Sequence, residues 1–141
     1  MKLIGQSVRR LEDRPLLTGA GRFAADVSFP HQHTMRVVRA PVAHGRLRVV
    51  DIRAALGAPG VVAVWTGADV AEVPPIDFRM TRVAGLEPYR QPILAREFVR
   101  YVGEPVACVF AGDAYVAEDA AELVTLEIEE LTPIVSATAF A

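Results

Sequence analysis

Cysteine is nearly missing from this 141-residue chain, which contains only Cys108. One thiol cannot close an internal disulfide, and it cannot supply the CxxC or four-cysteine patterns of zinc and iron–sulfur sites. This scarcity excludes a disulfide-stapled scaffold and is typical of a reducing compartment, so we expect a cytoplasmic protein. Because Cys108 stands in an apolar run, we expect an inert small hydrophobe and not a nucleophile.

Long hydrophobic runs are also missing. The opening MKLIGQSVRR lacks the apolar core of a secretory signal, and no later run is long enough to span a bilayer. The net charge of −2 gives no reason to expect nucleic acid or an anionic membrane as a partner. With 52% apolar and 23% charged residues, the chain is too apolar for intrinsic disorder, and we expect one globular domain.

Lysine is rare as well, since fourteen of the fifteen basic residues are arginine, the side chain suited to planar, partly buried ion pairs. The charge is unevenly distributed: residues 1–60 carry ten bases and four acids, and residues 61–141 carry five bases and thirteen acids. The two halves can neutralise each other within the fold, or they can form two faces for partners. The first alternative is favoured, and in the second the basic half is a candidate docking face.

Residues 1–33 are rich in turn formers and predict an extended arm that contains neither a helix nor a long strand. The apolar residues of this arm are too numerous for a solvated tail. We therefore expect them to be buried against the domain or against a partner. They are Leu11, Leu16, Leu17, Phe23, Val27 and Phe29.

Residues 34–141 alternate strand and helix patterns, and we expect them to form the domain proper. The run 61–65 (VVAVW) is continuously apolar and predicts a strand buried on both faces. Two successive strand–helix–strand units follow from this order, and we predict an α+β fold with one mixed sheet, two main helices and the N-terminal arm. The expected strands are 34–40, 45–52, 61–65, 105–111 and 125–131, and the expected helices are 51–58 and 113–124.

A loop is expected over residues 71–92, which contain four prolines and no sustained period. Loops of this length inside compact domains are usually functional or disordered. The loop is therefore the first place to look for a role.

No catalytic set is evident. The stretch from Gly19 to Ala24 spells GxGxxA, but no strand precedes it and no helix follows it, so a turn is favoured over a dinucleotide site. His31 and His33 could share a metal but lack a third ligand. His44 is interpreted as a turn residue bonded to backbone, and Glu104 as a turn acid, with a place at a site edge as its alternative.

Several stretches, in order, resemble one family. They are VRRLED (8–13), LLTG (16–19), GRF (21–23), RAPVAH (39–44), PGV (59–61), TGAD (66–69), RYVGEPVA (100–107) and AEDAAELV (117–124). Together they identify the chain as similar to the large subunits of the molybdenum hydroxylases: xanthine dehydrogenase, aldehyde oxidase and aerobic carbon monoxide dehydrogenase. Ala40 and Val42 depart from the serine and histidine that are usual in the stretch RAPVAH (39–44).

The resemblance implies an α/β hammerhead domain at the N-terminus of such a large subunit. It further implies that the molybdopterin cofactor lies in a following domain, and the iron–sulfur clusters and FAD in other domains or subunits. The chain alone is then expected to bind none of these cofactors and to be inactive. Its expected partners are a molybdenum-binding domain or subunit, an iron–sulfur subunit and a flavin subunit.

A structural and docking role remains, with residues 71–92 bordering the substrate channel of the complete oxidoreductase. The alternatives are a stand-alone or truncated interaction protein and an independent binder of a small ligand. The candidate channel residues are Phe78, Met80, Leu86 and Tyr89. The motif residues expected in structural or interface roles are Arg39, His44, Arg100, Tyr101, Gly103 and Glu104.

Overall fold

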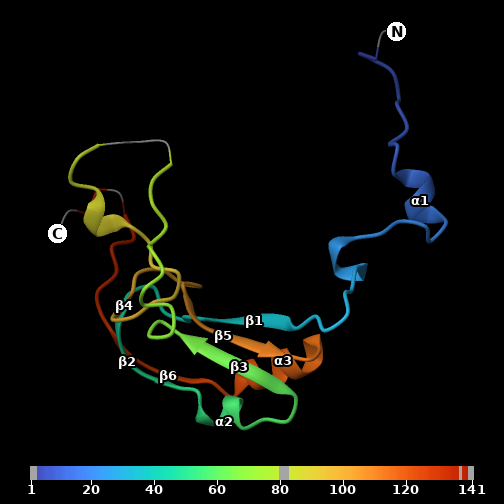
Figure 1. Cartoon of the computed structure of the whole chain (residues 1–141). Coiled ribbons are helices and arrows are strands. Elements are labelled where there is room, and N and C mark those ends of the chain that lie inside the picture. Colours follow the sequence, from blue (N-terminus) through green and yellow to red (C-terminus); the bar gives the residue numbers. More distant parts are fainter. Residues whose placement is uncertain (1–2, 80–82, 137, 140–141) are drawn as a thin grey trace. The chain divides into compact units, whose positions relative to one another are not determined.

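The computed structural model describes residues 3–79, 83–136 and 138–139 (Figure 1). The chain forms two compact units, Met1–Gln32 and His33–Ala141. The second unit carries both sheets and the buried core. Met80, one of the expected channel residues, lies outside the described residues.

The first unit contains more helix than its sequence predicts. Helix α1 spans Asp13–Leu17, and a 3₁₀ turn, η1, spans Ala24–Asp26. Pro15 sits in the first turn of α1, where a backbone N–H has no intrahelical partner, so proline does not prevent the helix. The apolar side chains of this unit are largely exposed in the single chain, Leu11 at 97% and Leu17 at 87%, so their burial against the domain or a partner stays a prediction.

The second unit is built on two three-stranded sheets. Sheet A has the order β1–β5–β3, and sheet B has the order β4–β2–β6. Every strand pair is antiparallel, so the expected single mixed sheet is wrong, whereas the α+β class is confirmed. The strands are β1 (Thr34–Arg39), β2 (Gly45–Asp51), β3 (Val61–Thr66), β4 (Phe98–Val99), β5 (Pro105–Ala111) and β6 (Thr125–Glu130).

The two helices of this unit connect the sheets. Helix α2 (Arg53–Leu56) leads from β2 in sheet B to β3 in sheet A, and α3 (Ala114–Glu122) leads from β5 back to β6. The predicted strand–helix–strand order is therefore correct, but neither unit joins neighbouring strands of one sheet. Asp113 caps α3 as predicted, because its Oδ1 accepts hydrogen bonds from the backbone N–H groups of Tyr115 and Val116.

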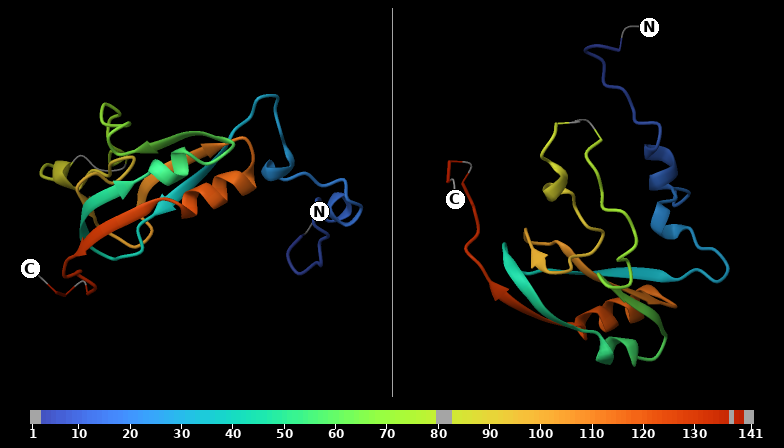
Figure 2. Two further views of the ribbon diagram at one scale, coloured as in Figure 1. Left: turned by 90° about the horizontal axis from the view of Figure 1, so that it is seen from below. Right: turned by 60° about the vertical axis from the view of Figure 1, so that its left-hand side comes forward.

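The core lies between the inner face of sheet A, the two helices and sheet B. Helix α3 packs along β1 and β5, on one side of sheet A (Figure 2). Two clusters of small and β-branched residues fill the interior. The first is Ala55, Val64, Val109, Ala120 and Val124, and the second is Ala40, Ala95, Val99 and Val106.

Strand β3 differs from its prediction. It lies at the edge of sheet A, beside β5 alone, and only Val64 of its residues is buried. Val62 is 55% exposed and Trp65 is 48% exposed. A run of apolar residues that looked like a strand buried on both faces is therefore an edge strand with an apolar side chain on its open face.

The charged halves of the chain are partly joined. Arg36 of β1 pairs with Glu118 of α3 at 2.6 Å, and Arg48 of β2 pairs with Glu129 of β6. Both pairs link the basic half to the acidic half, as the favoured alternative predicts. Two of the arginines on the candidate basic face are thus engaged within the fold.

Candidate functional site

The turn between β4 and β5 holds the one charged side chain among the described residues that is fully buried. This is Glu104, which is 1% exposed. Gly103, just before it, has a φ of 86°, in the left-handed region that glycine adopts without steric strain. The backbone of this turn is tied to β1, because Gly103 N donates to Ala40 O and Ala40 N donates to Glu104 O, at 2.8 and 2.9 Å.

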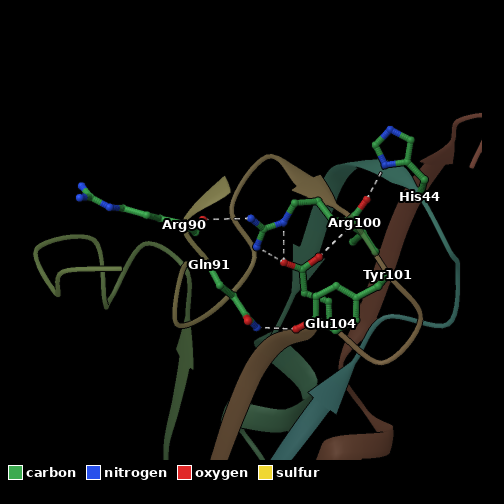
Figure 3. A network of polar contacts seen from close by, with 7 residues as sticks. His44, Arg90, Gln91, Arg100, Tyr101 and Glu104 are labelled. Carbon is green, nitrogen blue, oxygen red and sulfur yellow. Dashed lines mark hydrogen bonds and ion pairs between the residues drawn. The ribbon is translucent and has the colours of Figure 1, made fainter. Parts of the chain in front are cut away.

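The Glu104 carboxylate is held by Arg100 (Figure 3). Oε2 accepts the backbone N–H of Arg100 at 2.6 Å, and Oε1 accepts Arg100 Nε at 3.0 Å and pairs with Nη2. Burial of an unpaired carboxylate is strongly unfavourable, and these charge-assisted bonds offset that cost. Glu104 is thus the turn acid that the sequence favours, and its partner is local.

Arg100 also reaches the long loop. Its Nη1 donates to Arg90 O at 3.2 Å, and the neighbouring Tyr101 hydroxyl accepts a hydrogen bond from Gln91 Nε2 (Figure 3). The turn therefore contacts the end of the loop through two side chains.

Further polar contacts close the loop at its base. Ile76 and Gln91 form an antiparallel bridge. Next to it, Arg90 Nε lies 3.0 Å from Asp77 Oδ1. The backbone N–H of Phe78 and then the Arg90 guanidinium lower the pKa of Asp77 below its usual value, so the carboxylate stays charged.

On the other side of the turn, His44 connects to β4. Its Nδ1 lies 2.8 Å from Val99 O, and its ring stacks on Phe98. This is the backbone-bonded turn histidine that the sequence predicts. Arg39 Nη1 donates to Gly103 O at 2.8 Å. The motif residues expected from the sequence to have structural or interface roles are therefore neighbours in space, around one turn.

A surface groove of about 970 Å³ opens beside these residues. Tyr89, from the loop, lines this groove together with His44, Arg100 and Tyr101. The other described channel candidates do not line it. Phe78 is 40% exposed on the loop, and Leu86 is partly buried next to the 3₁₀ turn η2 (Glu87–Tyr89).

Sequence reasoning missed the residues that anchor the loop: Arg90, Gln91 and Arg96. Arg96 Nη2 donates to Ala71 O at 2.7 Å and to Val70 O at 3.1 Å, which fixes the start of the loop. The spacing of the arginines after the prolines was the available signal. Arg96 bonds two backbone carbonyls, Arg90 pairs with Asp77, and Gln91 bonds the Tyr101 hydroxyl. No local pattern identifies these partners.

The outer face of sheet A is a second feature that the sequence did not reveal. Residues directly opposite in an antiparallel pair share a face, and the strand register places six uncharged side chains together. Met35 and Trp65 are 52% and 48% exposed, and Trp65 contacts the Phe110 ring edge-on at 4.7 Å. We call this set the outer face: Met35, Val37, Ala63, Trp65, Cys108 and Phe110.

Cys108 lies in the middle of the outer face. Burial raises the pKa of its thiol, and the nearby Arg39 charge opposes this only in part. A thiol with a raised pKa is a poor nucleophile at neutral pH. The prediction of an unactivated cysteine is consistent with this environment.

Comparison with known proteins decides the family. Residues 18–132 match the family model described as "Aldehyde oxidase and xanthine dehydrogenase, a/b hammerhead domain". The chain belongs to this family. The hammerhead prediction, and the resemblance to molybdenum hydroxylase large subunits, are confirmed.

Relatives of this hammerhead chain are large subunits. It is 43% identical over 130 residues to the nicotine 6-hydroxylase large subunit of Paenarthrobacter nicotinovorans, covering 92% of this chain and 16% of that protein. It is 38% identical to the carbon monoxide dehydrogenase large chain of Hydrogenophaga pseudoflava, covering 88% and 15%. The chain thus spans about a sixth of the length of these relatives.

A solved structure shares the fold. Quinoline 2-oxidoreductase from Pseudomonas putida 86 matches with a TM-score of 0.77 and 44% identity, over 93% of this hammerhead chain and 17% of that one. The fold therefore belongs to a module that recurs within much larger chains.

The described residues of the hammerhead chain do not fit a metal centre. Its described part contains no group of three or more His, Cys, Asp or Glu side chains able to hold a metal ion. An iron–sulfur cluster needs four thiolates or a close equivalent, and the sequence has one cysteine.

The membrane prediction can be checked over the same described residues. No helix there is long and apolar enough to cross a bilayer.

Proposed function

We propose that this chain is the docking and channel-bordering module of a molybdenum hydroxylase large subunit, and that it performs no chemistry alone. The observation that carries the proposal is the outer face of sheet A, where six apolar or weakly polar side chains gather. Apolar area of this kind on a small domain marks an interaction site. The remainder of the large subunit is the proposed occupant.

The lengths of the relatives support this choice of occupant. The chain covers 15% to 17% of the large subunits it resembles, so most of such a subunit lies outside it. In this proposal the molybdopterin cofactor belongs to that remainder, and the iron–sulfur clusters and FAD to other domains or subunits. One relative is named a subunit of a dehydrogenase complex, which is consistent with further partners.

The test of docking is Trp65→Asp in the complete large subunit. A carboxylate on the outer face would be desolvated by docking without a partner, so we expect loss of the assembled, molybdenum-loaded subunit on gel filtration with metal analysis. The matched control is Tyr115→Asp, at an aromatic residue of α3 that is 83% exposed. Equal molybdenum loading in both variants would overturn the docking role.

The loop from 71 to 92 is proposed to border the route to the molybdenum site. Support comes from its anchored base and from the aromatic residues Phe78 and Tyr89, which stand exposed on it at 40% and 71%. Phe78→Ala and Tyr89→Ala in the complete enzyme should change the ratio of kcat/KM between small and large substrates. Tyr115→Ala is the control, and an unchanged ratio in both loop variants would count against this role.

A stand-alone interaction protein would use the same outer face. The two alternatives differ in what the purified chain does with the remainder of a large subunit, and co-purification from the source cells followed by metal analysis separates them. Molybdenum and iron that co-purify with the chain only through a partner support the module. Turnover of an aldehyde or purine by the purified chain alone would refute the claim of inactivity.

A further inference from the structure

Loop 76–91, the part of the long loop enclosed by the Ile76–Gln91 bridge, is closed by a pair of backbone hydrogen bonds. Ile76 N donates to Gln91 O at 2.8 Å, and Gln91 N donates to Ile76 O at 3.2 Å. An isolated bridge of two bonds is a weak closure for so long a loop, because closing the loop costs chain entropy. Other contacts must hold this base in place.

Within the loop, Arg90 pairs with Asp77 at this base, and the contacts from outside the loop come from the turn at Glu104. Arg100 Nη1 donates to Arg90 O, and the Tyr101 hydroxyl accepts from Gln91 Nε2, so both anchors act on the last two residues of the loop (Figure 3). The Arg100 side chain is 34% exposed. A partly exposed arginine has many rotamers, and without a second contact it would be free to turn into water.

Glu104 supplies that second contact. Its carboxylate binds Nε and Nη2 of Arg100, which leaves Nη1 directed at Arg90 O. Glu104 is itself fixed to the sheet, because its backbone O accepts the N–H of Ala40 at the end of β1. A rigid path therefore runs from sheet A through one buried carboxylate and one guanidinium to the loop.

We propose that Glu104 is a positioning residue that fixes the base of loop 76–91 through Arg100, and thereby tunes which substrates pass the loop. The second half of this statement rests on the proposed channel-bordering function, and the first half does not. The partner of the Glu104 carboxylate among the described residues is Arg100, which lies outside the loop. The influence of Glu104 is transmitted by the orientation of the Arg100 guanidinium.

The experiment uses the complete enzyme with Glu104→Gln, which keeps the side-chain volume but removes the charge that orients Arg100. Hydrogen–deuterium exchange at the Ile76 and Gln91 amides should become at least tenfold faster, as the bridge opens more often. The ratio of kcat/KM for a small and a large heterocycle or aldehyde should shift about fivefold, which corresponds to about 1 kcal/mol. Glu129→Gln is the matched control, because it breaks an exposed pair with Arg48.

A second variant covers the case in which Glu104→Gln fails to fold. Arg100→Lys keeps a positive charge beside Glu104 but lacks the separate nitrogen that reaches Arg90 O, so it should speed exchange at Gln91 with less loss of stability. If Gln91 exchange is unchanged in the folded variants, Glu104 is purely structural and the proposal is overturned. Faster exchange with an unchanged substrate ratio supports the positioning of the loop and refutes its role at the channel.

Discussion

The turn at Glu104 buries a charged side chain, whereas the outer face of sheet A leaves apolar side chains exposed. In the turn, a charged group is almost completely buried, and its carboxylate accepts hydrogen bonds from the backbone N–H and the guanidinium of Arg100. On the outer face, apolar rings such as Trp65 are half exposed. Among the described residues, no buried side-chain nitrogen or oxygen lacks a partner, so the buried polar side chains are paired while large apolar side chains stay exposed.

This difference separates what the domain needs to fold from what it offers to others. A buried carboxylate with its partners in the same turn depends on nothing outside the chain. The exposed side chains of Met35 and Trp65 contribute their hydrophobic stabilisation only when another protein surface covers them. The turn at Glu104 therefore has its bonding partners within the chain, whereas the outer face of sheet A requires a partner surface for its apolar side chains to be buried.

Removing the buried carboxylate should give the largest effect. Glu104→Ala leaves the Arg100 guanidinium and its backbone N–H without their acceptor and opens a cavity, so we expect a loss of about 3–5 kcal/mol in the free energy of unfolding. Urea denaturation of the chain measures this loss. The exposed Glu129→Ala should cost about 1 kcal/mol or less. Similar losses in both variants would remove the distinction drawn for the turn.

The two faces of sheet A should respond differently to truncation. Val109 is fully buried on the inner face. Val109→Ala should therefore lower the free energy of unfolding by about 2 kcal/mol, because apolar burial is lost and a cavity forms. Met35→Thr on the outer face should change the stability of the isolated chain by about 0.5 kcal/mol or less. The same Met35→Thr should become clearly destabilising in the complete subunit, and equal effects in both settings would argue against a covered face.

Much of this contrast follows from local sequence, but only on one side. The strands 34–40, 45–52, 105–111 and 125–131 were predicted because alternation and β-branched runs are local signals. The capped helix starting after Asp113 was predicted for the same reason. Glu104 as a turn acid follows from its place between glycine and proline, before a buried strand.

The remaining features depend on contacts between distant residues. Strand β4 is two residues long and exists only because β2 lies beside it. The exposure of Trp65 depends on which strand lies at the edge of sheet A, and the pattern VVAVW fits a central strand equally well. The loop is anchored through the backbone oxygen of Arg90, an atom that every residue type has, so the sequence does not indicate this contact.

Loss of a helix-capping hydrogen bond at the surface should lower the stability by less than Glu104→Ala does. Asp113 accepts two backbone N–H groups at the start of α3, at 2.8 and 2.9 Å, but it is exposed to water. Asp113→Ala should therefore cost about 1 kcal/mol, and Asp113→Ser, which keeps an acceptor, should restore most of it. Thermal unfolding followed by circular dichroism measures both. A loss of stability as large as that of Glu104→Ala would show that burial of the carboxylate does not determine the size of the loss.

The smallest effect is expected at an ion pair near the surface, between the half-buried Asp51 and the exposed Arg53. Hydrogen bonds from the Arg53 side chain, and then from its backbone N–H, lower the pKa of Asp51 from 3.8 to about 2. Because the folded-state pKa is the lower one, the stabilisation is present above pH 3.8 and is lost as the pH falls towards 2. The difference in free energy of unfolding between the wild type and Asp51→Asn should therefore shrink as the pH falls through this range. Urea denaturation at each pH measures this difference. In an Arg53→Gln background the difference should vary less with pH, and an undiminished pH dependence there would exclude Arg53 as the cause.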